Sequence, residues 1–165
     1  MTPKTPTLHM LCGKIASGKS SFAEQLGRDD GTVVLVEDVW LAALYPNRIS
    51  SSADFLRYSG HLRTAIGPHV VDLLKAGLSV VLDFQANTLE SRAWLREILD
   101  QTRAADALHW FDVPDAVCLE RLRKRNDTGD HPFAATQKQF HLISRHFVEP
   151  TPEEGFTIIK HGPNG

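Results

Sequence analysis

The sequence predicts one α/β domain built on a parallel sheet with helices on both faces. Three observations predict this fold class. Short apolar segments alternate from end to end with longer segments whose apolar residues recur at helical spacing. One short segment, Thr32–Val36, is apolar or β-branched throughout, as in a parallel strand covered on both faces. No repeat, linker or low-complexity stretch divides the chain, so we expect residues 1–165 to form a single domain.

The strands are expected where short apolar runs end in a glycine, a carboxylate or a turn. These runs are Thr7–Cys12, Thr32–Val36, Leu78–Asp83, Ala107–Asp112 and Phe156–Lys160. In sheets of this kind, ligands collect at the carboxyl ends of the strands. The glycine-rich and acidic features described below all fall at those ends, which supports a binding site there.

The segments between the strands have helical spacing, capping residues or both. They are Lys19–Leu26, Val39–Tyr45, Ala53–Lys75, Thr88–Arg103, Pro114–Arg125 and Thr136–Val148. We expect an irregularity at Gly67-Pro68 in the longest helix, because proline has no amide hydrogen to donate. The polar stretch Asn126–Pro132 is expected to be a loop.

Composition and charge exclude several classes of protein. The apolar fraction of 42% and the charged fraction of 23% are ordinary for a soluble globular domain, and the net charge of −2 argues against gripping long nucleic acid. No apolar stretch approaches the ~20 residues that span a bilayer, and the N-terminus lacks the apolar core of a secretion signal. Cys12 and Cys118 do not have the spacing of a metal site or of a disulfide framework, so we expect the protein to be located in the reducing cytoplasm.

The stretch GKIASGKS, Gly13–Ser20, follows the first expected strand and precedes the first expected helix. It satisfies the spacing G-x-x-x-x-G-K-[ST] in the context that this motif requires. Its glycines let the backbone curl so that successive amides face phosphate oxygens, and the helix N-terminus adds partial positive charge. Lys19 is expected to reach the β- and γ-phosphates of a nucleotide. The residues expected to bind the nucleotide are Gly13, Lys14, Ala16, Ser17, Gly18, Lys19, Ser20 and Ser21.

A magnesium site is expected beside this loop. The motif places the Ser20 hydroxyl to hold Mg²⁺. Asp83 follows the apolar run SVVL at the end of a strand, where a carboxylate can orient the ion directly or through water. The alternative for Asp83 is an exposed strand-end carboxylate or a helix cap.

A carboxylate opposite the γ-phosphate separates a kinase from a hydrolytic switch with the same loop. Asp38 and Glu37 both lie at the end of the second expected strand. A carboxylate there can accept a proton from an attacking hydroxyl. We assign this role to Asp38, because Glu37 is expected to continue the alternation of the strand. Capping of the following helix is the alternative for Asp38, and it does not exclude the role of a base.

Arg121 and Arg125 lie four residues apart in the segment ERLRKRN, so they share one face of a helix. Beside a polar loop, they could close over the triphosphate, stabilise charge on the transferred group and exclude water. Arg125 is also expected to contact the nucleotide. The alternative is that these basic residues answer the dipole at the helix C-terminus.

The acceptor is expected to contact the segment after Asp38 and the stretch after the third strand. These segments combine aromatic, basic and amide side chains, a composition that suits a planar or anionic small molecule. Helix packing, capping and solvated arginines are the alternatives. The candidate acceptor-binding residues are Asp38, Arg57, Arg63, Asn87 and Arg92.

Together, these motifs resemble a group of small P-loop kinases. The glycine-rich loop, Asp38, the run SVVLDF and the segment ERLRKRN are similar to those of chloramphenicol phosphotransferase, zeta toxins and polynucleotide kinase, whose uncharacterised bacterial relatives are often labelled AAA-family ATPases. The resemblance covers nearly the whole chain and implies a three-layer P-loop NTPase fold with five parallel strands in the order 2-3-1-4-5. By position, it implies nucleotide binding by Lys19 and Ser20, Asp38 as the general base, and a small lid at about residues 121–135 that carries Arg121 and Arg125.

The resemblance does not select an acceptor, because members of the group phosphorylate antibiotics, nucleotide sugars and nucleic-acid ends. We expect an ATP-dependent kinase, with Mg²⁺ as cofactor, that phosphorylates a hydroxyl of a small molecule. A polynucleotide 5′-end kinase and a module that binds ATP and hydrolyses it slowly or not at all are the alternatives. Neither a membrane nor a long nucleic acid is expected as a partner. The protein is expected to be a monomer or homodimer, and the choice between ATP and GTP stays open.

Overall fold

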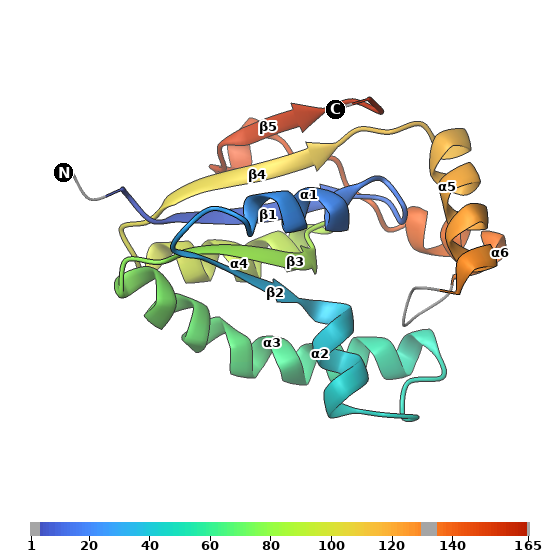
Figure 1. Ribbon diagram of the computed structural model, residues 1–165, viewed down its shortest axis with the longest axis horizontal. Coiled ribbons are helices and arrows are strands. Elements are labelled where there is room, and N and C mark those ends of the chain that lie inside the picture. The colour runs from blue at the N-terminus through green and yellow to red at the C-terminus, as the bar shows by residue number, and fades with distance from the viewer. Residues whose placement is uncertain (1–3, 130–134, 165) are drawn as a thin grey trace.

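The computed structural model describes residues 4–129 and 135–164 of the chain. Within them, five strands form one sheet in the order β2-β3-β1-β4-β5, and every neighbouring pair is parallel. Figure 1 shows this sheet surrounded by helices. The expected strand order is confirmed. The strands are β1 (Thr7–Gly13), β2 (Thr32–Val36), β3 (Ser79–Gln85), β4 (Ala105–Phe111) and β5 (Ile158–His161).

The helices lie between the strands as expected, with differences in extent. α2 begins at Glu37 rather than Val39, so the expected continuation of the second strand through Glu37 is wrong. α5 continues to Thr128, so the expected loop at Asn126 begins later, and residues 130–134 of that loop and of the expected lid lie outside the described residues. The helices are α1 (Lys19–Leu26), α2 (Glu37–Leu44), α3 (Ser52–Lys75), α4 (Leu89–Asp100), α5 (Asp115–Thr128), α6 (Gln137–Ser144) and the short 3₁₀ helix η1 (Pro152–Glu154).

The expected irregularity at Gly67-Pro68 is wrong, because α3 is a continuous helix of 24 residues that includes Pro68. Proline removes one hydrogen bond of the helix. Ile66, Val70 and Leu74, on both sides of it, are at most 4% exposed and pack in the core. Burial of this apolar face holds the helix together across the missing bond.

The core has two parts, one on each face of the sheet. On one face, Leu62 of α3 and Leu95 of α4 pack in the cluster that contains Leu82. On the other face, α1 and α5 pack in a cluster that contains Val81 and Leu122. The neighbouring residues Val81 and Leu82 of β3 thus face opposite sides, as successive residues of a strand do. This arrangement gives the three expected layers.

Three histidines form a hydrogen-bonded ladder across three neighbouring strands. His109 of β4 lies between His9 of β1 and His161 of β5, with ring nitrogens 3.0 Å apart on each side. Phe22 of α1 packs on His109 and His161, with ring centroids 4.7 and 4.8 Å apart. Burial, and after it the neighbouring imidazoles, lowers the pKa of His109 to about 4, so this ring is neutral at pH 7. The first helix therefore packs on a polar, titratable ladder.

The carboxyl ends of β1 to β4 meet at one edge of the sheet, beside α2, α5 and α6 (Figure 1). The glycine-rich loop leaves β1 at this edge, α2 leaves β2, and α5 follows β4. Residues that are far apart in the sequence therefore come together here. Across the described part of the chain, no helix has the length and apolar character needed to cross a membrane.

Candidate active site

The glycine-rich loop joins β1 to α1 and has a backbone curled tightly around a small space. Gly18 has φ 106°, a left-handed conformation that glycine adopts without steric cost. Gly13 is required for a different reason, since a Cβ there would lie 2.6 Å from Ser17 Oγ and 3.0 Å from Phe111 Cβ. Ser17 Oγ is buried and has no hydrogen-bond partner among the described residues. The loop thus holds a polar atom that a bound anion could satisfy.

Lys19 folds back over this loop. Its Nζ donates hydrogen bonds to the carbonyl oxygens of Gly13 and Lys14, the second at 3.0 Å. Burial lowers the pKa of the Lys19 ammonium, and the charge of Asp83 opposes this shift. The side chain of Lys14 turns away to Asp115, with 2.6 Å between Nζ and Oδ1. Of the two lysines, Lys19 therefore provides the side-chain charge inside the loop, and Lys14 contributes its main chain.

Asn87 holds the first glycine of the loop. Its Nδ2 donates to Gly13 O at 2.8 Å, and its Oδ1 accepts from Gly13 N, also at 2.8 Å. Both halves of the side-chain amide are therefore used within the protein. The expectation that Asn87 binds the acceptor stays a prediction, since the residue lines the cleft but its amide already bonds to Gly13. In this structure the amide fixes the start of the glycine-rich loop.

Ser20 and Asp83 lie together, as expected for a magnesium site. Ser20 Oγ donates a hydrogen bond to Asp83 Oδ2 at 2.9 Å. The pairing of β1 with β3 brings them together, because it puts the end of β3 beside the start of α1. Among the described residues, no group of three or more His, Cys, Asp or Glu could hold a metal. A magnesium ion at Ser20 and Asp83 would therefore take its other ligands from a nucleotide and water.

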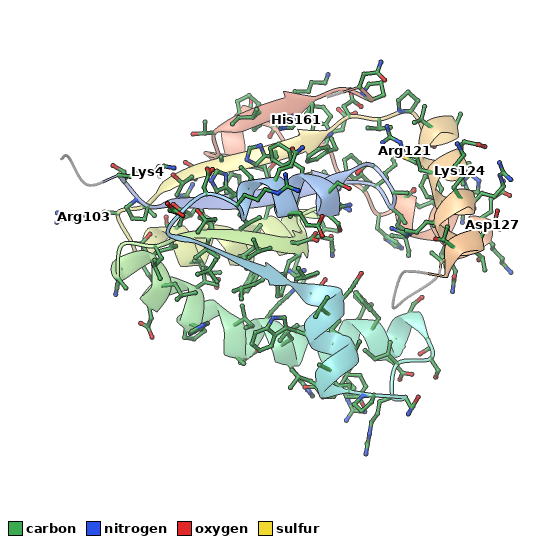
Figure 2. The ribbon with its side chains drawn as sticks, viewed as in Figure 1. Lys4, Arg103, Arg121, Lys124, Asp127 and His161 are labelled. Carbon is green, nitrogen blue, oxygen red and sulfur yellow. The ribbon has the colours of Figure 1, made fainter. Side chains whose placement is uncertain are left out.

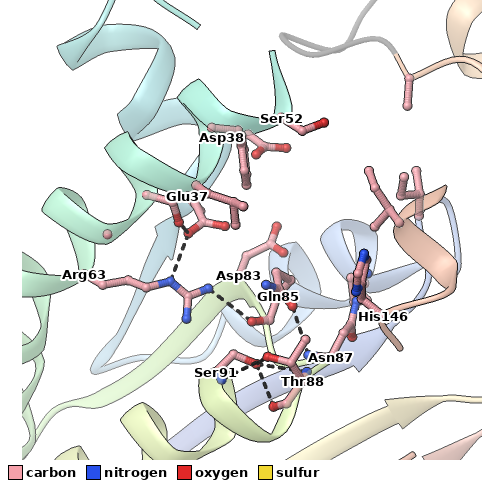
Figure 3. Close-up of a pocket in the computed structure, with 18 of the residues that line it drawn as sticks. Glu37, Asp38, Ser52, Arg63, Asp83, Gln85, Asn87, Thr88, Ser91 and His146 are labelled. Atoms are coloured by element: carbon pink, nitrogen blue, oxygen red, sulfur yellow. Dashed lines mark hydrogen bonds and ion pairs between the residues drawn. The ribbon is translucent and has the colours of Figure 1, made fainter. Parts of the chain in front are cut away.

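Asp38 lines the same cleft as the glycine-rich loop, from the first turn of α2. Burial, and after it the charge of Asp83, raises the pKa of Asp38, whereas Arg125 and Lys19 lower it. Figure 3 shows Asp38 and Asp83 directed toward the same space. The carboxylate that the sequence singled out is therefore within electrostatic reach of the loop lysine and of one lid arginine.

Glu37, the neighbouring acid, has a different environment. It is only 3% exposed, and its Oε2 accepts a hydrogen bond from Ser59 Oγ at 2.6 Å. Arg63 Nε lies 3.4 Å from the same oxygen. Ser59 was not singled out from the sequence, although its place four residues before Arg63 puts both residues on one face of α3. Glu37 is thus a paired, buried acid, whereas Asp38 faces the cleft.

Arg63 connects four elements below the cleft. Besides its contact with Glu37 of α2, its Nη2 donates to the carbonyl oxygen of Gln85 at the end of β3 at 3.2 Å. Its guanidinium lies 4.9 Å from the ring centroid of Trp94 in α4 and 5.8 Å from that of Phe84. Figure 3 shows Arg63 reaching from α3 between Glu37 and Gln85. Arg63 lines the cleft, but protein groups already surround its charge, so the expectation that it binds the acceptor stays a prediction.

Two of the expected acceptor ligands do not reach the cleft. Arg57 is exposed and lies over the Tyr58 ring, 5.6 Å from its centroid. Arg92 is 1% exposed, and its Nε donates to Glu154 Oε1 at 2.7 Å while its Nη1 donates to Ala86 O at 2.8 Å. Neither arginine lines the described cleft, so both assignments to the acceptor stay predictions that this structure does not support. Arg92 instead ties α4 to η1 and to the end of β3, through a partner 62 residues away in the sequence.

Arg121 lines the cleft beside the glycine-rich loop. Its Nη1 donates to Ser17 O at 3.3 Å, and its Nη2 donates to Pro163 O at 2.7 Å. Figure 2 shows Arg121 on the side of α5 nearer the sheet and Lys124 on the outer side. The helical spacing therefore selected the right face of α5.

Arg125 lines the cleft one turn farther along α5. Its Nε is buried and has no hydrogen-bond partner among the described residues. Burial lowers the pKa of Arg125, and the carboxylate of Asp38 opposes this shift. Arg125 and Asp38 thus approach one space from two different elements, α5 and α2.

Apart from Gly13, Lys14, Arg57 and Arg92, the residues proposed for the site line one cleft of about 1540 Å³. The part we call the nucleotide end is formed by residues 15–21 with Arg121 and Arg125. The part we call the acceptor end lies between α3 and α4. Asp38 and Asp83 lie where the two ends meet. The acceptor end is lined by Glu37, Ser59, Gly60, Arg63, Thr64, Glu90, Trp94 and Glu97.

Comparison with known structures identifies the same fold in several kinases. A sugar kinase from Janibacter sp. HTCC2649 superimposes with a TM-score of 0.68 at 17% identity, covering 98% of this chain and 87% of that one. The Mycobacterium tuberculosis APS kinase CysC, in complex with AMPPNP and APS, gives 0.59 at 20% identity, covering 99% and 91%. A chain of the Pnkp1/Rnl/Hen1 RNA repair complex gives 0.60 at 20% identity, covering 89% of this chain and 48% of that one.

The sequence comparison is consistent with this fold. No curated protein matches the chain. Residues 8–150 match the AAA domain family AAA_33, a range that includes the glycine-rich loop, Asp38, Asp83, Arg121 and Arg125. The chain therefore belongs to the AAA domain family AAA_33, and its fold is that of the small P-loop kinases.

Proposed function

We propose that this protein is a kinase that uses ATP and Mg²⁺ to phosphorylate a hydroxyl group of a small molecule. The observation that carries the proposal is the position of Asp38, which lines the same cleft as Lys19 and Ser20. Transfer to an alcohol needs a proton acceptor beside the nucleophile. The similar fold of a sugar kinase and of an APS kinase supports the choice of a small acceptor.

The glycine-rich loop is proposed to bind the triphosphate. Its curled amides, the positive end of α1 and the unpartnered Ser17 Oγ give it the donors that phosphate oxygens need. Lys19 would exchange its bonds to main-chain carbonyls for bonds to phosphate oxygens. Bound ATP, with Mg²⁺ held by Ser20 and Asp83, would supply the phosphoryl group.

Asp38 is proposed as the general base rather than Glu37. Burial raises the pKa of both carboxyl groups, so their basicity does not separate them. The Glu37 carboxylate is occupied by Ser59 and Arg63. The acceptor hydroxyl would transfer its proton to a carboxylate oxygen of Asp38 as its oxygen bonds to the γ-phosphorus of ATP. The bond from that phosphorus to the bridging oxygen of the β-phosphate would break, and ADP would leave.

The arginines of α5 are proposed to act from the opposite wall. Arg125 has an Nε without a hydrogen-bond partner among the described residues, so it can turn to charge that develops on the transferred group. Arg121 donates to Ser17 O and thereby ties α5 to the glycine-rich loop. Together they would help to exclude water, which a kinase needs in order to avoid hydrolysis.

The substitution Asp38→Asn tests the proposal, because it removes the proton acceptor and keeps the size of the side chain. We expect kcat to fall by at least ~10²-fold, with ATP affinity measured by calorimetry largely kept. The reaction is followed as acceptor-dependent ADP release with a panel of alcohols. Asp30→Asn, in the exposed turn after α1, is the matched control and should be fully active. Full activity of Asp38→Asn would remove Asp38 from the mechanism, and a wild type that binds no Mg-ATP would reject the nucleotide site.

A polynucleotide 5′-end kinase is the second candidate, and the fold shared with a chain of an RNA repair complex favours it. Labelling of short oligonucleotides with radioactive ATP distinguishes it from the first. A module that binds ATP without transferring phosphate is the third candidate. It would show tight ATP binding and no product with either kind of acceptor.

A further inference from the structure

Charge is divided along the cleft, and from this division we infer that the acceptor is an uncharged or amine-bearing alcohol with no phosphate or sulfate group near the hydroxyl that reacts. The inference rests on the proposed kinase function and names its class of substrate. Composition alone suggested a planar or anionic acceptor, because the segment after Asp38 combines aromatic residues with arginines. The contacts of those arginines point the other way.

Most of the cations that line the cleft lie at the nucleotide end. Lys19 and Arg121 donate to main-chain carbonyls, and Arg125 Nε has no partner among the described residues. Besides these three, the basic residues that line the described cleft are Arg63 and His146. Figure 3 shows His146 across the cleft from Arg63, beside Asn87. Arg63 is therefore the one cation placed between α3 and α4 in the described lining.

The charge of Arg63 is already balanced. Glu37 Oε2 lies 3.4 Å from its Nε, Gln85 O accepts from its Nη2, and Trp94 covers one face of its guanidinium. The Arg63 side chain is 15% exposed and that of Glu37 is 4% exposed. An acceptor phosphate that took Arg63 away would leave the Glu37 carboxylate buried with less compensation, which is unfavourable.

Carboxylates outnumber cations at the acceptor end. Glu90 and Glu97 line it together with Trp94 at the spacing of one face of α4, and Glu37 adds a third carboxylate. Arg63 is the one cation in the described lining of the acceptor end. Opposite α4, a Cβ at Gly60 would meet nothing within 4 Å, so the α3 wall is open there. Although Glu90 and Glu97 are exposed, the acceptor end therefore has room for an acceptor and carries a negative charge that disfavours a phosphate and favours an amine.

Acceptors that share a scaffold, with one hydroxyl kept, replaced by an amine or esterified with phosphate, test this inference. The probes are glucose, glucosamine and glucose 6-phosphate, together with adenosine and adenosine 3′-phosphate, each with saturating Mg-ATP. We expect kcat/KM for the neutral or amine-bearing member of each set to exceed that of the phosphorylated member by at least ~10-fold. Product is identified by mass spectrometry, so that ATP hydrolysis is not counted. A preference for the phosphorylated members would overturn the inference.

Substitutions on α4 identify the groups responsible. Glu90→Gln combined with Glu97→Gln is expected to raise KM for amine-bearing acceptors by about 5- to 10-fold, to leave kcat unchanged, and to reduce discrimination against phosphorylated ones. Glu24→Gln, on the exposed side of α1 outside the cleft, is the matched control and should keep the wild-type preference. Thermal unfolding of each variant confirms that it is folded. An unchanged charge preference in the double variant would overturn the role of these carboxylates and the inference built on them.

The outcomes also separate this inference from the proposed function. Phosphorylated product from anionic acceptors alone would leave the kinase function standing and overturn the charge preference. Binding of Mg-ATP without product from any acceptor would overturn both.

Discussion

The nucleotide end and the acceptor end of the cleft both contain arginines, but the arginines differ in what surrounds them. Arg125 has a buried Nε without a partner in the described structure, and Arg121 donates to main-chain carbonyls. Arg63 is paired with a buried carboxylate and covered by an indole. A bond to a main-chain carbonyl can be exchanged when a phosphate arrives, whereas a buried ion pair resists exchange. An arginine beside a cleft therefore indicates an anion site only when it can exchange its existing bonds within the protein for bonds to the anion.

The largest effect is expected from a substitution at the nucleotide end of the cleft. Arg125→Gln should lower kcat by about 10²- to 10³-fold, the scale for loss of one donor to developing charge. Because Arg125 lowers the pKa of Asp38, its removal should also move the acidic limb of the kcat/KM profile to higher pH. Steady-state kinetics from pH 5 to 8 measure both effects.

The control for this substitution is Arg123→Gln on the same helix. The Arg123 side chain is 64% exposed and pairs with Glu120 on the surface, so we expect nearly unchanged kinetics. Equal losses in both variants would mean that Arg125 acts through the stability of α5 rather than on the reaction.

The second effect concerns stability at the acceptor end. Glu37→Gln and Arg63→Gln should each lower the free energy of unfolding by about 2–3 kcal/mol, because each leaves a buried partner unpaired. The double variant should lose less than the sum of the two. Urea unfolding followed by circular dichroism measures all three, and Arg57→Gln, which is exposed, should stay within about 0.5 kcal/mol of wild type. If Arg63→Gln left stability unchanged and raised only the KM of the acceptor, Arg63 would be a substrate ligand and the contrast between the two ends would fail.

The smallest expected effect concerns the histidine ladder on which α1 packs, and it is measured as the pH dependence of the free energy of unfolding. The folded pKa of His109, about 4, is lower than the ordinary value of 6.5, so the unfolded chain binds more protons between these two values. The contribution of His109 to the free energy of unfolding is therefore complete above pH 6.5 and is lost as the pH falls toward 4. We expect wild type to lose about 1–2 kcal/mol between pH 7 and pH 5 from this source.

His109→Gln isolates that contribution. The variant should show a shallower dependence of the unfolding free energy on pH than wild type, measured by urea titrations at both pH values. His69→Gln, an exposed histidine of α3, is the control and should keep the wild-type slope. An unchanged slope in His109→Gln would mean that the ladder contributes nothing to acid sensitivity.

Much of the fold followed from local pattern. The bounds predicted for the strand Thr32–Val36 are those observed, because a short β-branched and apolar run is typical of a parallel strand covered on both faces. Helix α3 was predicted with an irregularity at Pro68 that is absent, because packing on the sheet is invisible in a local window. Alternation predicts that Glu37 continues β2, whereas in the structure it begins α2 and its carboxylate contacts Ser59 and Arg63 of α3.

The candidate site divides in the same way. Ser20 and Asp83 could be paired in advance, since the motif places one and the end of a strand places the other. The roles of Asn87 and Arg92 could not be predicted, because their partners, Gly13 and Glu154, are 74 and 62 residues away.

By itself, the sequence determined the alternation of strands and helices, the glycine-rich loop and the helical face that carries Arg121 and Arg125. Each of these depends on residues within one or two turns of one another, so a short window contains the information. Only the tertiary structure decided which charges are free and which are already paired. That decision depends on long-range contacts made when β1, β3 and the helices around them pack together. The acceptor end of the cleft is made almost entirely of such contacts.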